Sequence, residues 1–210
     1  EVIDNPVLVI APVALLLCIA VLSTPLMRSD IQHRSDAVID QLTGMLNRKA
    51  LSTRVIELSQ QSVLTGESVG IIIGDLDHFK DINDTRGHTV GDVVLKDVAY
   101  QMRKQLRAFD LAYRLGGEEF LILLPGSDLA QSAQLAEQLR SGIAQSSVAG
   151  GIGVTMSFGV GASRNGEPFD YGKVFKMADA ALYRAKGNGR DQVCLSEPLS
   201  APLRGVPAFA

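Results

Sequence analysis

Gly116-Gly117-Glu118-Glu119 separates two short apolar runs, Leu111–Leu115 and Phe120–Leu124. Runs of this length, joined by residues that tolerate positive φ, are typical of two buried strands in a tight hairpin. Successive side chains in extended backbone point to opposite sides, so Glu118 and Glu119 should have different surroundings and different roles. By itself the pattern is best explained as a solvated acidic turn, so a functional interpretation depends on the rest of the chain.

Helical and strand-like patterns alternate on both sides of this hairpin. A β-branched run over 69–73 ends at Asp75, and 152–160 is also strand-like. Apolar residues at helical spacing occupy 49–64, 90–109, 129–143 and 174–186. The alternation predicts an α/β domain over about residues 40–195, with helices packed on a sheet.

The segment before this domain has the pattern of a membrane helix. Residues 7–27 are 21 consecutive uncharged, mostly apolar residues, about the length that spans a bilayer core of roughly 30 Å. Arg28 and Arg34 follow, whereas the charges before the run are acidic, which places the C-terminal side in the cytoplasm. We therefore expect a transmembrane helix within 1–27 and a linker helix over 28–41. A buried core helix is the alternative.

The composition excludes several classes of protein. The net charge is −3 and no dense run of Lys and Arg occurs, so a nucleic-acid partner is not expected. Two cysteines, Cys18 and Cys194, cannot form a disulfide framework. Three prolines among small residues predict a disordered tail over 196–210.

Carboxylates elsewhere change the interpretation of the hairpin. Asp75 is expected at the C-terminal end of a buried strand, where α/β proteins usually bind ligands. With Glu118 and the backbone carbonyl of Leu76, it would offer the hard oxygen ligands that Mg²⁺ takes alongside substrate phosphates. Asp77 is as well explained as a turn or capping residue. His78 and His88 are expected in turns near the site.

Basic residues that suit a triphosphate accompany these carboxylates. Lys80 follows the first acidic pair, and Lys186 and Arg190 flank Gly187-Asn188-Gly189. A glycine-containing turn lets backbone and long basic side chains approach phosphates closely. Each of these charges alone would more simply be a solvated surface group.

Taken together, the motifs over residues 40–193 resemble the GGDEF diguanylate cyclase domains, and five separate pieces match in order. They are Asp40-Gln41-Leu42-Thr43-Gly44-Met45-Leu46-Asn47-Arg48, Asp75-Leu76-Asp77-His78-Phe79-Lys80 with Asn83-Asp84, Gly87-His88-Thr89-Val90-Gly91-Asp92, Gly116-Gly117-Glu118-Glu119-Phe120, and Lys186-Gly187-Asn188-Gly189-Arg190. The hairpin is the GGEEF form of the family motif.

The resemblance implies a fold and a set of roles. The fold would be a palm-like nucleotidyl cyclase fold, a central, mostly antiparallel or mixed five-stranded sheet surrounded by helices, preceded here by the apolar helix. Catalysis would involve Asp75, Glu118, Glu119 and Lys186, and two Mg²⁺ or Mn²⁺ ions per site would be bound by Asp75, Leu76 and Glu118. Substrate would be bound by Asn83, Asp92, Lys80, Phe79, Leu95, Gly116, Gly117 and Arg190.

The implied reaction joins two GTP molecules into cyclic di-GMP and releases two pyrophosphates. Because the product is symmetric, two domains with facing sites are required, so a homodimer is expected. The Asp92 carboxylate only accepts hydrogen bonds, which suits the N–H groups of guanine and not adenine. The residues leave open whether Glu119 or a metal-bound oxygen removes the proton of the 3′-hydroxyl. The expected location is the bacterial inner membrane, with the cyclase domain in the cytoplasm.

Arg107 and Asp110 match the family's product-inhibition site, where cyclic di-GMP would bind. Arg-x-x-Asp alone is usually an ion pair on a helix, and Arg can also bind guanine in bidentate fashion. Many family members add an arginine on the next helix; here Gln138 occupies that place and Arg140 lies nearby.

Two other functions compete with a cyclase. A catalytically silent GGDEF domain could act as a receptor for cyclic di-GMP or GTP, but such domains usually lose the glutamates or the aspartate that are present here. A different nucleotidyl cyclase, such as an adenylyl cyclase, is disfavoured by the hairpin and by Asp92.

Overall fold

The computed structural model describes residues 38–197. The predicted membrane helix over 1–27, most of the predicted linker and nearly all of the predicted tail lie outside these residues. Residues 38–41, the end of the predicted linker helix, are not helical, and Ile39 forms an isolated bridge with Leu46. Between residues 38 and 197, no helix has both the length and the apolar character needed to cross a bilayer.

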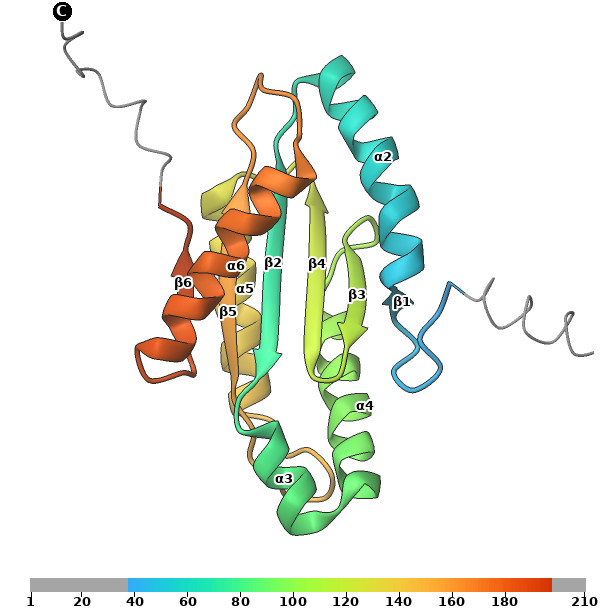
Figure 1. Cartoon of the computed structure of the whole chain (residues 1–210), viewed down its shortest axis with the longest axis vertical. Helices are drawn as coiled ribbons and strands as arrows, with labels where there is room; N and C mark the ends of the chain where they lie inside the picture. Colours follow the sequence, from blue (N-terminus) through green and yellow to red (C-terminus); the bar gives the residue numbers. More distant parts are fainter. Residues whose placement is uncertain (1–37, 198–210) are drawn as a thin grey trace, which may run out of the picture. The chain divides into compact units, whose positions relative to one another are not determined.

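This part of the chain forms six strands and five helices (Figure 1). In chain order they are β1 (Leu46–Asn47), α2 (Arg48–Thr65), β2 (Val69–Leu76), α3 (Phe79–Arg86), α4 (His88–Gln105), β3 (Leu111–Gly116), β4 (Glu119–Pro125), α5 (Leu129–Ala144), β5 (Met156–Ala162), α6 (Tyr171–Gly187) and β6 (Val193–Leu195).

The strands form one mixed sheet in the order β1-β3-β4-β2-β5-β6. The four inner strands are mutually antiparallel, whereas β1 runs parallel to β3 and β6 parallel to β5. Strand β2 is buried along its whole length, because it lies at the centre with helices on both faces. The expected mixed, mostly antiparallel sheet is confirmed. The predicted number of five strands is wrong, because the sheet in this part of the chain has six.

Alternating side chains of the inner strands divide the core into two layers. Ile72 of β2 packs with α4 and α5 on one face, and Ile71 and Ile73 pack with α2 and α6 on the other. Figure 1 shows α2 and α6 in front of the sheet and α4 and α5 behind it. The expected helices on a sheet are thus arranged as two covering layers.

Two predicted elements have different limits in the structure. The predicted helix over 90–109 ends at Gln105, because Leu106 is extended (φ −85°, ψ 147°) and the Asp110 carboxylate accepts a hydrogen bond from the Arg107 N–H (2.8 Å). Such local side-chain acceptors compete with helical hydrogen bonding. The strand predicted over 152–160 is β5, which begins four residues later at Met156 and ends at Ala162.

Candidate active site

The β3–β4 hairpin forms as predicted, with its turn at Gly117 and Glu118. Gly116 and Gly117 have φ of 148° and 52°, values that residues with a Cβ rarely adopt. Glu118 is half-buried whereas Glu119 is exposed. The two glutamates therefore have different surroundings, as expected from their alternation.

Strand register brings Asp75 to the two hairpin glutamates. Asp75 on β2 is paired with Glu119 on β4, and the next residue, Leu76, donates its N–H to the Glu118 carbonyl oxygen (3.3 Å). Lys186, near the end of α6, places its Nζ 2.9 Å from Asp75 Oδ2. The structure thus gathers all four predicted catalytic residues at one end of the sheet.

Burial raises the pKa of the Asp75 carboxyl. The hydrogen bond and charge of Lys186 lower it, and the nearby Glu118 and Glu119 raise it further. The side chain is only 10% exposed, so water screens this crowding of negative charge poorly. Such a cluster favours an additional cation.

The donor set fits a divalent metal bound together with a substrate. Within residues 38–197, no group of three or more His, Cys, Asp and Glu side chains forms a metal cage. Asp75, Glu118 and the Leu76 carbonyl would therefore supply only part of a coordination shell. Mg²⁺ commonly accepts one or two carboxylates and completes its shell with phosphate oxygens and water.

The position of Lys186 follows from close packing of α6 on β5. A Cβ on Gly159 would lie 2.1 Å from the Ala178 carbonyl oxygen and 2.2 Å from the Leu182 nitrogen. A side chain at that place would push the helix away from the sheet. Beyond α6, Arg190 lies exposed in a loop with φ of 65°.

The residues expected to hold the base lie on α3 and α4. A Cβ on Gly91 would lie 2.0 Å from Asn83 Oδ1 and 3.1 Å from the Phe79 ring. Asn83 is therefore packed against the helix next to Asp92, which is exposed. Phe79 and Leu95 are 7% and 2% exposed, so they would form the floor of a base site. Lys80 is exposed in the first turn of α3.

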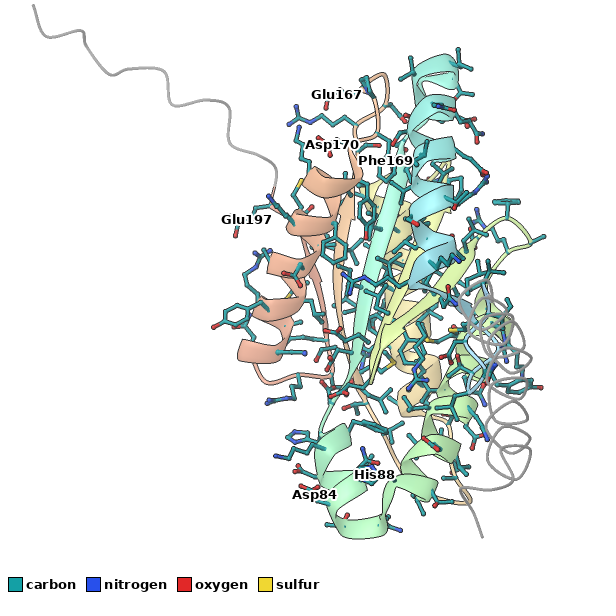
Figure 2. All side chains as sticks on the ribbon, turned by 45° about the vertical axis from the view of Figure 1, so that its right-hand side comes forward. Asp84, His88, Glu167, Phe169, Asp170 and Glu197 are labelled. Atoms are coloured by element: carbon teal, nitrogen blue, oxygen red, sulfur yellow. The ribbon has the colours of Figure 1, made fainter. Side chains whose placement is uncertain are left out.

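The two histidines near this region fit their predicted positions. His78 precedes α3 with φ of 57°, and His88 is the first residue of α4. Figure 2 shows His88 with Asp84 at the α3–α4 end of the domain. Both histidines are exposed, as expected for turn residues.

Arg114 was missed by sequence reasoning. Its guanidinium donates two hydrogen bonds to the Gly117 carbonyl oxygen (3.0 and 2.8 Å) and contacts both Asp40 carboxylate oxygens (3.2 and 3.3 Å). The hairpin turn is thus tied to the segment that enters the domain. The only signal in the sequence was a basic residue in an apolar run just before the glycines.

Arg107 and Asp110 lie in the loop between α4 and β3, so the helical ion pair considered above is not formed. They line a cavity of about 210 Å³ that α5 closes with Gln131, Gln134 and Gln138. Arg140 does not belong to it, since its guanidinium binds Glu137 (2.6 Å) and Asp191 (2.8 Å). The α5 side of the pocket is therefore lined by glutamines, and Gln138 stands at the place where many family members have an arginine.

A second cavity, of about 400 Å³, lies at the end of the sheet opposite Asp75, where Ala162 pairs with Gly70. Its lining includes Glu167, Asp170 and Glu197, which Figure 2 shows at the end of the domain remote from His88. It contains none of the predicted site residues.

A mixed sheet covered by helices, with a carboxylate cluster beside a lysine at one end, defines an α/β domain with a candidate active site, and comparison with known proteins identifies the family. The chain belongs to the GGDEF family: the sequence model described as "Diguanylate cyclase, GGDEF domain" matches residues 37–192. The expectation drawn from the motifs is confirmed.

Individual relatives agree with this assignment. The chain is 39% identical over 176 residues to the response regulator PleD of Caulobacter vibrioides, covering 81% of this chain and 38% of PleD. It thus spans less than half of that relative's length.

Solved structures show the same fold. The GGDEF domain of DgcB from Caulobacter crescentus, in complex with c-di-GMP, has a TM-score of 0.71 and 31% identity, covering 78% of this chain and 98% of that domain. The active GGEEF domain of a diguanylate cyclase from Vibrio cholerae has a TM-score of 0.68 and 30% identity, covering 72% and 97%.

Proposed function

We propose that this domain is an active diguanylate cyclase, which condenses two GTP molecules into cyclic di-GMP and releases two pyrophosphates. The observation that carries the proposal is the gathering of Asp75, Glu118, Glu119 and Lys186 at one end of the sheet. A domain that only binds nucleotides has no need of two glutamates crowded around the buried Asp75. The active GGEEF relative supports the same function.

The chain's residues divide the work of the reaction. Asn83 and Asp92 hold guanine, while Lys186 and Arg190 hold the triphosphate by charge. Asp75, Glu118 and the Leu76 carbonyl hold Mg²⁺ or Mn²⁺, two ions per site, which neutralise phosphate charge when bound. Glu119, exposed at the start of β4, is assigned to the attacking 3′-hydroxyl. Most of the rate enhancement then comes from positioning and charge neutralisation.

The test is incubation of the purified protein with GTP and Mg²⁺, followed by identification of products by mass. Cyclic di-GMP and pyrophosphate in a 1:2 ratio are expected, and Glu119→Gln should abolish both. Binding of GTP without turnover by the folded protein would instead support a silent receptor. A cyclic mononucleotide would support another class of cyclase.

We further propose that cyclic di-GMP inhibits the enzyme through the pocket bordered by Arg107, Asp110 and Gln138. Arg107 contributes charge and a planar donor group, whereas Gln138 offers only a neutral amide, so binding should be weaker than with two arginines. Arg107→Ala should move the inhibition curve to higher cyclic di-GMP. An unchanged curve would rule this pocket out.

Residues 7–27 are proposed to anchor the protein in the bacterial inner membrane, with the cyclase domain in the cytoplasm. The support is the sequence pattern alone: an uncharged apolar run followed by Arg28 and Arg34. Fractionation of cells that produce the chain tests it, because an anchored protein stays with membranes after alkaline carbonate washing. Recovery in the wash would contradict the proposal.

A further inference from the structure

We propose that Asp77 is a positioning residue, which fixes the end of the loop that follows Lys186 so that Arg190 faces the triphosphate. The inference rests on the proposed function, since Arg190 is assigned there to the phosphates. The sequence is compatible with two roles for Asp77, a site residue or a turn or capping residue. Its contacts in the structure decide what it does.

The Asp77 carboxylate accepts three hydrogen bonds from two separate parts of the chain. Oδ1 accepts from the Ser157 hydroxyl (2.7 Å), and Oδ2 accepts from the Thr155 hydroxyl (2.7 Å) and from the backbone N–H of Asp191 (3.0 Å). Asp77 itself is 5% exposed. The contact with Asp191 joins the end of β2 to the residue that directly follows Arg190.

The loop needs such an anchor because of its backbone conformation. Gly189, Arg190 and Asp191 have φ of 111°, 65° and 42°. Arg190 and Asp191 thus occupy the left-handed region, which residues with a Cβ disfavour. The Arg190 N–H is bonded to the Ala185 carbonyl oxygen (3.0 Å), so it is the following residue, Asp191, that depends on a contact with another part of the fold.

A second contact holds the same loop from the surface. Asp191 Oδ1 accepts from the Arg140 guanidinium (2.8 Å), and Arg140 is also bonded to Glu137 one turn earlier on α5. Asp191 is therefore held through its backbone by Asp77 and through its side chain by Arg140. The loop is fastened to both β2 and α5.

The geometry separates this role from that of a metal ligand. Both carboxylate oxygens of Asp77 are engaged by protein donors, and two of the three donors are hydroxyl groups, which can reverse direction. An asparagine could direct its amide group to the Ser157 hydroxyl and keep its oxygen on the Asp191 N–H. A positioning role therefore survives Asp77→Asn, whereas a role that needs negative charge does not.

The experiment compares Asp77→Ala, Asp77→Asn and Arg140→Gln with the wild type. We expect Asp77→Ala to lower kcat/KM by about 10- to 100-fold, mainly by raising KM for GTP, because Arg190 is misplaced. Asp77→Asn should restore kcat/KM to within about threefold of wild type, since the acceptor remains. Arg140→Gln should raise KM by about threefold, because the loop keeps its anchor on Asp77.

Matched controls separate the loop from general damage. Glu137→Gln removes the other partner of Arg140 but leaves the bond to Asp191, and Asp179→Ala removes an exposed carboxylate of α6; both should keep wild-type KM. Hydrogen exchange should quicken at residues 187–191 in Asp77→Ala and stay unchanged in both controls. If Asp77→Ala does not fold, the KM for GTP and the hydrogen-exchange rates of Arg140→Gln test the proposal instead.

Several outcomes would overturn the inference. Equal loss of kcat/KM in Asp77→Asn and Asp77→Ala would show that the negative charge of Asp77 is required. If Asp77→Ala folds and keeps the wild-type KM and hydrogen-exchange rates, the loop needs no such anchor. If Asp77→Ala does not fold, the same result in Arg140→Gln leads to the same conclusion. If the wild type makes no cyclic di-GMP, the proposed function is wrong. The positioning role of Asp77 is then tested by the GTP affinity and hydrogen-exchange rates of the same variants.

Discussion

Gly91 shows how a single missing side chain shapes the base site. Asn83 Oδ1 occupies the space that a Cβ on Gly91 would need, 2.0 Å away. Gly91→Ala should leave the fold intact, because alanine favours helices by about 1 kcal/mol over glycine and Asn83 can swing aside. If Asn83 holds the base as proposed, the displaced carboxamide loses that bond, and KM for GTP should rise by about tenfold.

Steady-state kinetics with GTP checks this expectation. Val93→Ala, two residues along at a 40% exposed position of the same helix, is the matched control and should keep wild-type KM. An unchanged KM in Gly91→Ala would show that the position of Asn83 does not matter for binding.

Single residues were predictable from the sequence where a role belongs to a motif. Asp75, Glu118 and Lys186 were expected together and lie together. The contacts of Asp77 and Arg140 could not be predicted, because each depends on Asp191, 114 and 51 positions away. Only the register of β2 with β5 and the packing of α5 bring these residues into contact.

At the scale of elements, the seating of α6 on β5 decides where Lys186 points. Gly159→Ala would place a methyl group against backbone atoms of Ala178 and Leu182. Backbone cannot move as a flexible side chain does, so we expect the free energy of unfolding to fall by about 1–3 kcal/mol or more. Urea denaturation measures it.

Gly153→Ala is the matched control for this substitution, because a Cβ there meets nothing within 4 Å. Its free energy of unfolding should equal that of the wild type. Similar stability of both variants would mean that α6 can shift without cost, and the packing argument for Lys186 would fail.

The hairpin and the start of the domain are linked by a pH-dependent contact. Burial alone would raise the pKa of Asp40, but hydrogen bonds from Thr43 and the Arg114 guanidinium lower it overall. A depressed folded-state pKa adds stability above the unfolded value of about 3.9, and this stability is lost as pH falls through the folded-state pKa.

Asp40→Asn should therefore destabilise the domain at pH 7, and the difference from wild type should shrink as pH falls below about 3.9. Urea denaturation at a series of pH values measures the difference. Asp128 caps α5 and is not bonded to Arg114, so Asp128→Asn should leave the hairpin contact unaffected. A difference that stays constant down to acid pH would exclude the charge of Asp40 as the cause.

Long elements were predictable from periodicity, and short ones were not. The helices α2, α5 and α6 agree with their predicted limits within three residues, because each shows several turns of apolar spacing. Strands β1 and β6 have two and three residues, too few for any alternation to be read. The eight-residue α3 was likewise hidden within a motif.

At the scale of the whole domain, residues 38–197 contain one set of the proposed catalytic residues, whereas the proposed product is made from two substrates. We therefore expect specific activity to fall as the protein is diluted, because two domains must face each other. Activity assays over a dilution series, with light scattering for molecular mass, measure this. A covalently linked pair should keep its activity on dilution, whereas full activity of a verified monomer would contradict the proposal.

The two shortest strands have a further consequence if the domain works as a pair, as proposed. The edge strands of the sheet are β1 and β6, each of three residues or fewer. Long open edges recruit strands from other molecules and lead to aggregation, and very short edge strands limit this. Two copies of such a domain can therefore meet and separate reversibly, without their sheets joining into fibres.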